Sequence, residues 1–156
     1  MATSRKSALK DAAIPAVINA VINGAIAYSS HAGRDAVPVT VDAISSSEAT
    51  VGSEAAMIAL MLAVILTSIT ALLVRRGLAQ REPGRAAAPF FPTVPWLALQ
   101  NALMLFGATV VAAVLWQRAA GTVLVSAVTA AILVAVFAGA VTVVVHIRTT
   151  AALLRG

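Results

Sequence analysis

The polar residues that lie in or beside long apolar runs are the ones whose types and spacing could do chemistry in this chain. Most are uncharged and lie inside the runs, and two are acidic and lie near the start of the second run. The set comprises Asn19, Asn23, Thr67, Gln100, Asn101, Glu48 and Glu54. Polar groups are costly at membrane depth, which makes them the first candidates for function there. Because amides donate and accept hydrogen bonds and carboxylates attract cations, the set predicts a path for a small solute or an ion.

Asn19 and Asn23 lie one helical turn apart and therefore share a helix face. One interpretation is that both amides line the path. The other is that they bond a neighbouring helix, at about 0.6–2 kcal/mol for each bond. Neutral amides are cheaper to bury than charges, which favours the second interpretation. The expected partners of the two asparagines are Gln100, Asn101, Thr67, Ser68 and Thr70. Of the two, Asn19 should be the one that reaches Gln100 and Asn101.

Glu54 and Glu48, together with Asp42, give an acidic character to the segment before the second apolar run. As a group they could form a vestibule that attracts cations. Alternatively, carboxylates near a helix N-terminus favour the helix dipole and simply face water, and this second interpretation is the simpler one.

The sequence carries no motif for catalysis or for a bound metal. It has no cysteine, so disulfides, thiolate metal sites and iron–sulfur clusters are excluded. His31 and His146 belong to opposite ends of the expected helices and cannot share one haem or metal ion. No nucleophile elbow, phosphate-binding loop or dinucleotide fingerprint occurs. We therefore expect no enzyme, no cofactor and no metal.

The elements that must position these residues follow from composition. Of 156 residues, 60% are hydrophobic and 11% charged, and the mean hydropathy is +0.95. Soluble domains average about 45–50% apolar and 25% charged residues. Runs near 20 residues long, without the alternation of barrel strands, predict helices that cross a bilayer. We expect an all-α, polytopic membrane protein: a single domain built as a compact bundle of four transmembrane helices.

The runs give spans at about 12–28, 55–74, 96–116 and 121–145. Residues 117–120 should then form a tight turn between the last two spans. The spacing of Ser45 to Glu48 resembles a capping box, so a helix should begin near Ser46 and continue into the second span.

The basic residues predict an orientation. One side of the expected bundle holds Arg5, Lys6, Lys10, Arg75, Arg76, Arg81, Arg85, Arg148 and Arg155, and the other holds Arg34 and Arg118. By the positive-inside rule both termini are cytoplasmic, and the chain belongs in the plasma (inner) membrane. Charges placed at the ends of apolar runs also argue against nucleic acid as a partner.

The N-terminal basic residues and the apolar run that follows, ending in Ala25-Ile26-Ala27, also resemble a cleavable signal peptide. Asn19 and Asn23 inside the run weaken that interpretation. We therefore expect the segment to be retained as the first span.

Small residues recur every four positions in three of the spans, which favours close helix packing in lipid. The first stripe contains Ala16, Ala20 and Gly24, the second Ala59 and Ala63, and the last Ala131, Ala135 and Gly139. The stripes could join helices within one chain or between chains. We expect the lipid bilayer as one partner, and a second copy of the chain or another integral membrane protein as the other. The leading functional hypothesis is passage of a small solute or ion by a homo-oligomer; the alternative is a non-catalytic membrane subunit or scaffold.

Overall fold

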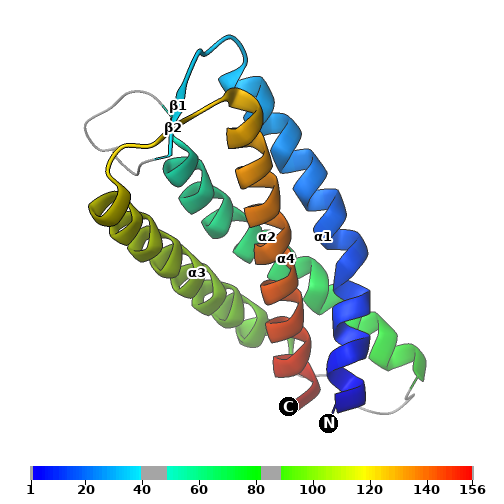
Figure 1. Ribbon diagram of the computed structural model, residues 1–156. Helices are drawn as coiled ribbons and strands as arrows, with labels where there is room; N and C mark the ends of the chain where they lie inside the picture. The colour runs from blue at the N-terminus through cyan, green and yellow to red at the C-terminus, as the bar shows by residue number, and fades with distance from the viewer. Residues whose placement is uncertain (1, 40–48, 82–88, 156) are drawn as a thin grey trace.

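The computed structural model describes residues 2–39, 49–81 and 89–155, which form four long helices and two very short strands (Figure 1). In chain order these are α1 (Ala2–His31), β1 (Val37–Pro38), α2 (Val51–Arg81), α3 (Phe90–Ala120), β2 (Leu124–Val125) and α4 (Ala127–Arg155). Each helix is long and apolar enough to cross a membrane. The prediction of an all-α fold with four such helices is confirmed.

The helices form a bundle in which α4 and α2 are central. α1 packs along α4, α4 packs against α2, and α2 packs along α3. Both chain ends lie at the same end of the bundle, as expected for an even number of helices that alternate in direction (Figure 1). At the opposite end β1 and β2 pair antiparallel, with Val37 beside Val125 and Pro38 beside Leu124. This pairing ties the connection after α1 to the connection before α4.

The contact between α1 and α4 is made by two of the small-residue stripes. A Cβ atom added at Gly24 would lie 2.9 Å from the Cβ of Ala135, closer than side chains normally approach. One at Gly139 would lie 3.5 Å from the Cβ of Ala20. These two stripes therefore join helices within one chain, and glycine at position 24 lets the two backbones come together.

The remaining stripe, on α2, lies in the centre of the bundle. Ala59, Ala63 and Ala71 on α2 are fully buried. Around Ala63 lies a buried hydrophobic cluster from three helices, namely Leu62, Leu66, Ala102, Ala138, Val141 and Val145. The middle of the bundle is thus apolar along the length of α2 between its first turn and Thr67.

Three expected boundaries differ from the structure. α3 continues through residues 117–120, which are not a turn, and the backbone N–H of Gly121 ends it by donating to the carbonyl of Gln117. Hydropathy alone assigns residues 121–126 to the fourth span. In the structure they form the connection to α4, because Leu124 and Val125 form a strand and not a helix. The side-chain oxygen of Ser126 then caps α4 by accepting from the N–H of Thr129.

The start of α2 is the third difference. Ser46 lies outside the described residues, but Ala49 and Thr50 are not helical and the helix begins at Val51. Thr50 is its N-cap: the N–H of Ser53 donates to the Thr50 hydroxyl, and the N–H of Thr50 donates to the Ser53 hydroxyl. This reciprocal cap has the logic of a capping box with serine at the third position.

Candidate functional site

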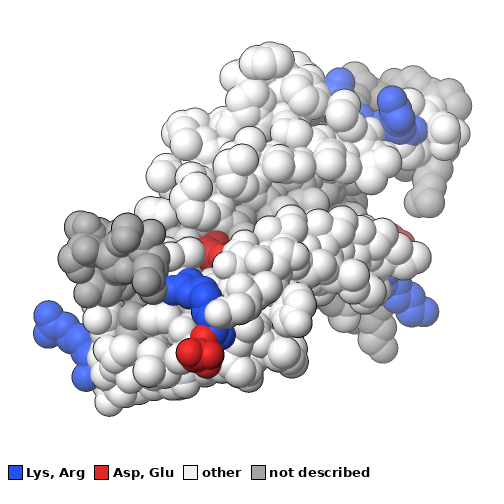
Figure 2. Space-filling model, turned by 90° about the horizontal axis from the view of Figure 1, so that it is seen from above, with Lys and Arg blue, Asp and Glu red and all other residues white. Residues whose placement is uncertain are grey.

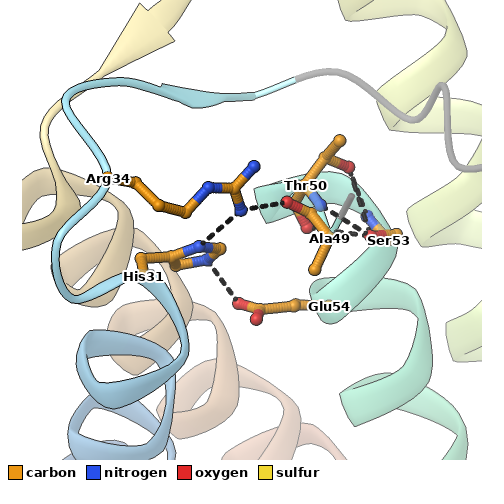
Figure 3. Close-up of polar contacts among 6 residues, drawn as sticks. All are labelled: His31, Arg34, Ala49, Thr50, Ser53 and Glu54. Carbon is orange, nitrogen blue, oxygen red and sulfur yellow. Dashed lines mark hydrogen bonds and ion pairs between the residues drawn. The ribbon is translucent and has the colours of Figure 1, made fainter. Parts of the chain in front are cut away.

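Glu54 and His31 meet where the end of α1 lies beside the first turn of α2 (Figure 3). The Nε2 atom of His31 lies 3.1 Å from Oε2 of Glu54. The His31 side chain is completely buried and that of Glu54 is 18% exposed. A guanidinium nitrogen of Arg34, Nη1, lies 3.2 Å from the other ring nitrogen of His31, Nδ1. The three side chains form one continuous polar chain.

The two contacts of His31 together fix how its ring is protonated. A guanidinium can only donate hydrogen bonds and an ionised carboxylate can only accept them. Nδ1 must therefore carry the lone pair that accepts from Arg34, and Nε2 must carry the hydrogen that is donated to Glu54. His31 is thus a neutral bridge between a cation and an anion.

The local backbone explains why Arg34 can reach back to His31. Gly33 adopts a φ of +82°, which turns the chain sharply at the end of α1. The N–H of Arg34 donates to the carbonyl of His31 across this turn. On its far side, Nη1 of Arg34 donates to the carbonyl of Ala49, directly before the Thr50 cap (Figure 3). The cluster therefore links the end of α1 to the start of α2.

Glu54 also lines a small recess between α1 and α2, with a volume of about 140 Å³. Asn23 lies in the same recess, and the remaining lining residues are Ile26, Ala27, Met57 and Ile58. The side-chain nitrogen of Asn23 donates to the carbonyl of Asn19 in its own helix, and its Oδ1 accepts no hydrogen bond from the described residues. Among the described residues, Oε1 of Glu54 has no hydrogen-bond partner. The recess is thus lined by one amide and one carboxylate in otherwise apolar surroundings, a chemistry suited to a small cation.

Seen from above in Figure 2, most of the visible surface is uncharged, and the charged atoms lie mainly near its margins. Away from the margins, acidic atoms are partly visible in a hollow, and basic atoms and a second acidic group lie nearby. Within the described part of the chain, no group of three or more His, Asp or Glu residues could hold a metal ion.

A second polar cluster lies toward the end of the bundle that holds the termini. The side-chain nitrogen of Asn101 on α3 donates to the hydroxyls of Thr67 on α2, at 3.0 Å, and Thr149 on α4, at 3.4 Å. Its oxygen accepts a hydrogen bond of 3.0 Å from Nε of Arg148. Asn101, Thr67 and Thr149 are all buried. This cluster joins three helices and uses both ends of the Asn101 amide.

The structure therefore separates the residues predicted to line one path. Asn23 and Glu54 share the recess, whereas Asn101 and Thr67 bond one another elsewhere. Gln100 is exposed on α3 and belongs to neither group. Glu48 lies outside the described residues, as does Asp42.

The expected pairing of Asn19 with Asn101 is wrong. Asn19 donates its side-chain nitrogen to the carbonyl of Pro15, one turn back in α1. The physical reason is the order of the helices, because α1 packs on α4 while α3 packs on the opposite side of the bundle, along α2. When no polar partner on another helix faces it, an asparagine side chain can form a hydrogen bond with a backbone carbonyl of its own helix.

Two participants were missed by reasoning from sequence. His31 was considered only as a metal ligand, and Arg34 only as a charge on the minority side. The signal available was their spacing: a histidine at a helix end, a glycine two residues on and an arginine directly after it. The pairing with Glu54 depends on how α1 and α2 both pack on α4, which sequence spacing does not reveal. Comparisons of the chain with protein-family models, curated proteins and solved structures give no match.

Proposed function

We propose that the chain is a multi-pass protein of the plasma (inner) membrane with both termini in the cytoplasm. The support is the length and apolarity of all four helices and the placement of the basic residues. Lys10, Arg75, Arg76 and Arg148 belong to the helix ends near the termini, whereas Arg34 and Arg118 belong to the opposite end. On this proposal the recess with Glu54 opens toward the outer side.

We further propose that the protein passes a small cation or cationic solute across the membrane as a homo-oligomer and is not an enzyme. The observation that carries this proposal is the recess, which brings Asn23 of α1 and Glu54 of α2 together although they are far apart in sequence. A carboxylate at this depth is costly unless it serves a structural or functional purpose, and one of its oxygens is not used by the described residues.

An oligomer is part of the proposal because the core of a single chain is apolar below the recess. Leu62, Ala63 and Leu66 lie between Glu54 and the Asn101 cluster along α2. The recess lies in the angle between α1 and α2, each of which packs against α4. A second copy placed against this angle would complete a path that one chain does not contain.

Flux measurements on liposomes containing the purified protein test the proposal. Removing the amide in Asn23→Leu, or the negative charge in Glu54→Gln, should lower cation flux roughly tenfold or more, equivalent to about 1.4 kcal/mol. The matched control is Asn19→Leu, which removes the same amide one turn away, where it bonds only Pro15. Equal flux in all four proteins would reject passage through the recess.

The second candidate is a non-catalytic membrane subunit or scaffold. The observation that favours it is the internal use of Asn101, Thr67 and Thr149, which leaves the outer face of α3 largely apolar. Leu103, Val111 and Leu115 are exposed on that face. Replacing all three by alanine should then release a co-purifying integral protein without changing flux. The stripe of Ala131, Ala135 and Gly139 is unsuited to this test because its last two members pack on α1.

A further inference from the structure

A groove runs between α3 and α4 near the end of the bundle that holds the termini. Both helices pack against α2, and they make little direct contact with one another. The groove has a volume of about 530 Å³, within the range of about 300–1,000 Å³ common for ligand sites. Its lining is mostly apolar and consists of Pro92, Thr93, Trp96, Leu97, Gln100 and Ala152.

Arg148 is not among the lining residues of this groove, but it lies close to one of them along α4. It precedes the lining residue Ala152 by one turn on α4, and its partner Asn101 follows the lining residue Leu97 by one turn on α3. Residues four apart share a helix face, so the guanidinium and the groove lie on the same side of the two helices.

The guanidinium is held in place by one nitrogen only. Its Nε donates to Oδ1 of Asn101, and Asn101 is itself fixed by Thr67 and Thr149. Within the part of the chain that the structure describes, the terminal nitrogens Nη1 and Nη2 have no partner. An arginine anchored through Nε presents its remaining donors as a planar fork, the geometry that matches a phosphate group.

We propose that this groove binds a phospholipid with an anionic headgroup, whose phosphate is held by Arg148. Charge complementarity selects the phosphate, and the apolar lining accommodates the start of an acyl chain. Trp96 is 60% exposed beside the groove, and tryptophan prefers the membrane interface. Basic pockets between helices on the cytoplasmic side bind anionic headgroups. The inference rests on the proposed insertion of the helices in a membrane, but it is independent of any passage of solute.

Native mass spectrometry of the full chain in mild detergent tests the inference. The probes are phosphatidylglycerol, phosphatidylcholine with the same acyl chains, and inorganic phosphate. The wild type should retain phosphatidylglycerol, and Arg148→Gln should weaken its retention about tenfold, since a charge-assisted pair is lost. Arg148→Lys should retain phosphatidylglycerol better than Arg148→Gln but less well than the wild type, because lysine keeps the charge but lacks the planar fork of donors.

The matched control is Arg118→Gln, which removes the same charge from an exposed position at the other end of α3. It should retain phosphatidylglycerol as well as the wild type does. A second variant, Ala152→Trp, fills the groove without changing any charge and should also lower retention. A thermal melt of each variant separates loss of lipid from loss of fold.

Three results would overturn the inference: equal retention in wild type and Arg148→Gln, equal retention of phosphatidylcholine, or saturation by inorganic phosphate alone. The last result would indicate an anion site without a lipid. If carbonate extracted the protein from membranes, the proposed membrane insertion itself would be wrong. This outcome differs from that of an inserted protein that does not distinguish lipids by their headgroup.

Discussion

His31 is the residue whose environment differs most from expectation, since its sequence position suggests at most a metal ligand and not a buried bridge between two charged side chains. Its burial is tolerable because both ring nitrogens have partners, Arg34 on one side and Glu54 on the other. Sequence reasoning identified Glu54 as important by its place at the start of an apolar run. It could not identify the bridge, because α1 and α2 are brought together by packing on α4.

Replacing His31 by leucine should destabilise the protein by about 2–3 kcal/mol, because the Glu54 carboxylate loses a partner without leaving its apolar surroundings. His31→Gln, which can donate and accept like the neutral ring, should cost less. The free energy of unfolding in mixed detergent micelles measures both. Equal stability of His31→Leu and wild type would mean that the bridge contributes nothing.

Asn101 and Gln100 are neighbours in sequence and were predicted to serve the same path, but they differ in environment. Asn101 is buried and bonded to three side chains, while Gln100 is exposed at the groove. We expect Asn101→Leu to lower the free energy of unfolding by about 1–3 kcal/mol, because two buried hydroxyls and an arginine lose their hydrogen-bond partner. Gln100→Leu should be within about 0.5 kcal/mol of wild type. The same unfolding assay measures both variants. A larger loss of stability in Gln100→Leu than in Asn101→Leu would contradict the assignment of Asn101 to the core.

At the scale of the helices, hydropathy located all four elements but not their ends. The capping residues Thr50 and Ser126 set the starts of α2 and α4. Residues 121–126 are as apolar as the helix that follows, so a window of hydropathy cannot separate them from it. What separates them is the pairing of β2 with β1, a contact between segments far apart in the chain.

The small-residue stripes were identified from sequence, and the structure adds which of them meet. Gly24 of α1 lies against Ala135 of α4, so Gly24→Ala forces the two backbones apart. We expect a loss of about 1–3 kcal/mol in the free energy of unfolding.

The matched control is Gly107→Ala on α3, where an added Cβ would meet nothing within 4 Å. Alanine should there be neutral or stabilise the helix by up to about 1 kcal/mol. If both alanine variants behaved alike, close contact between α1 and α4 would not be what Gly24 provides.

For the whole molecule, the two polar clusters lie toward opposite ends of an otherwise apolar bundle. The cluster of His31, Arg34 and Glu54 belongs to the end with the short strands, and the cluster around Asn101 to the half nearer the termini. Composition and charge placement were enough to propose the fold class and an orientation. They could not show that the polar residues divide into two groups, because that division follows from the order α1–α4–α2–α3 across the bundle.

The orientation is the claim on which the outer recess and the inner groove both depend, and cysteine labelling tests it most directly. The chain has no cysteine, so a single introduced thiol is the only target for a reagent. Asp35→Cys lies in the connection after α1, and Gln80→Cys lies near the end of α2; both positions are exposed. An impermeant maleimide added to intact cells should label Asp35→Cys and should label Gln80→Cys only after lysis. Labelling of Gln80→Cys from outside, with Asp35→Cys protected, would contradict the account.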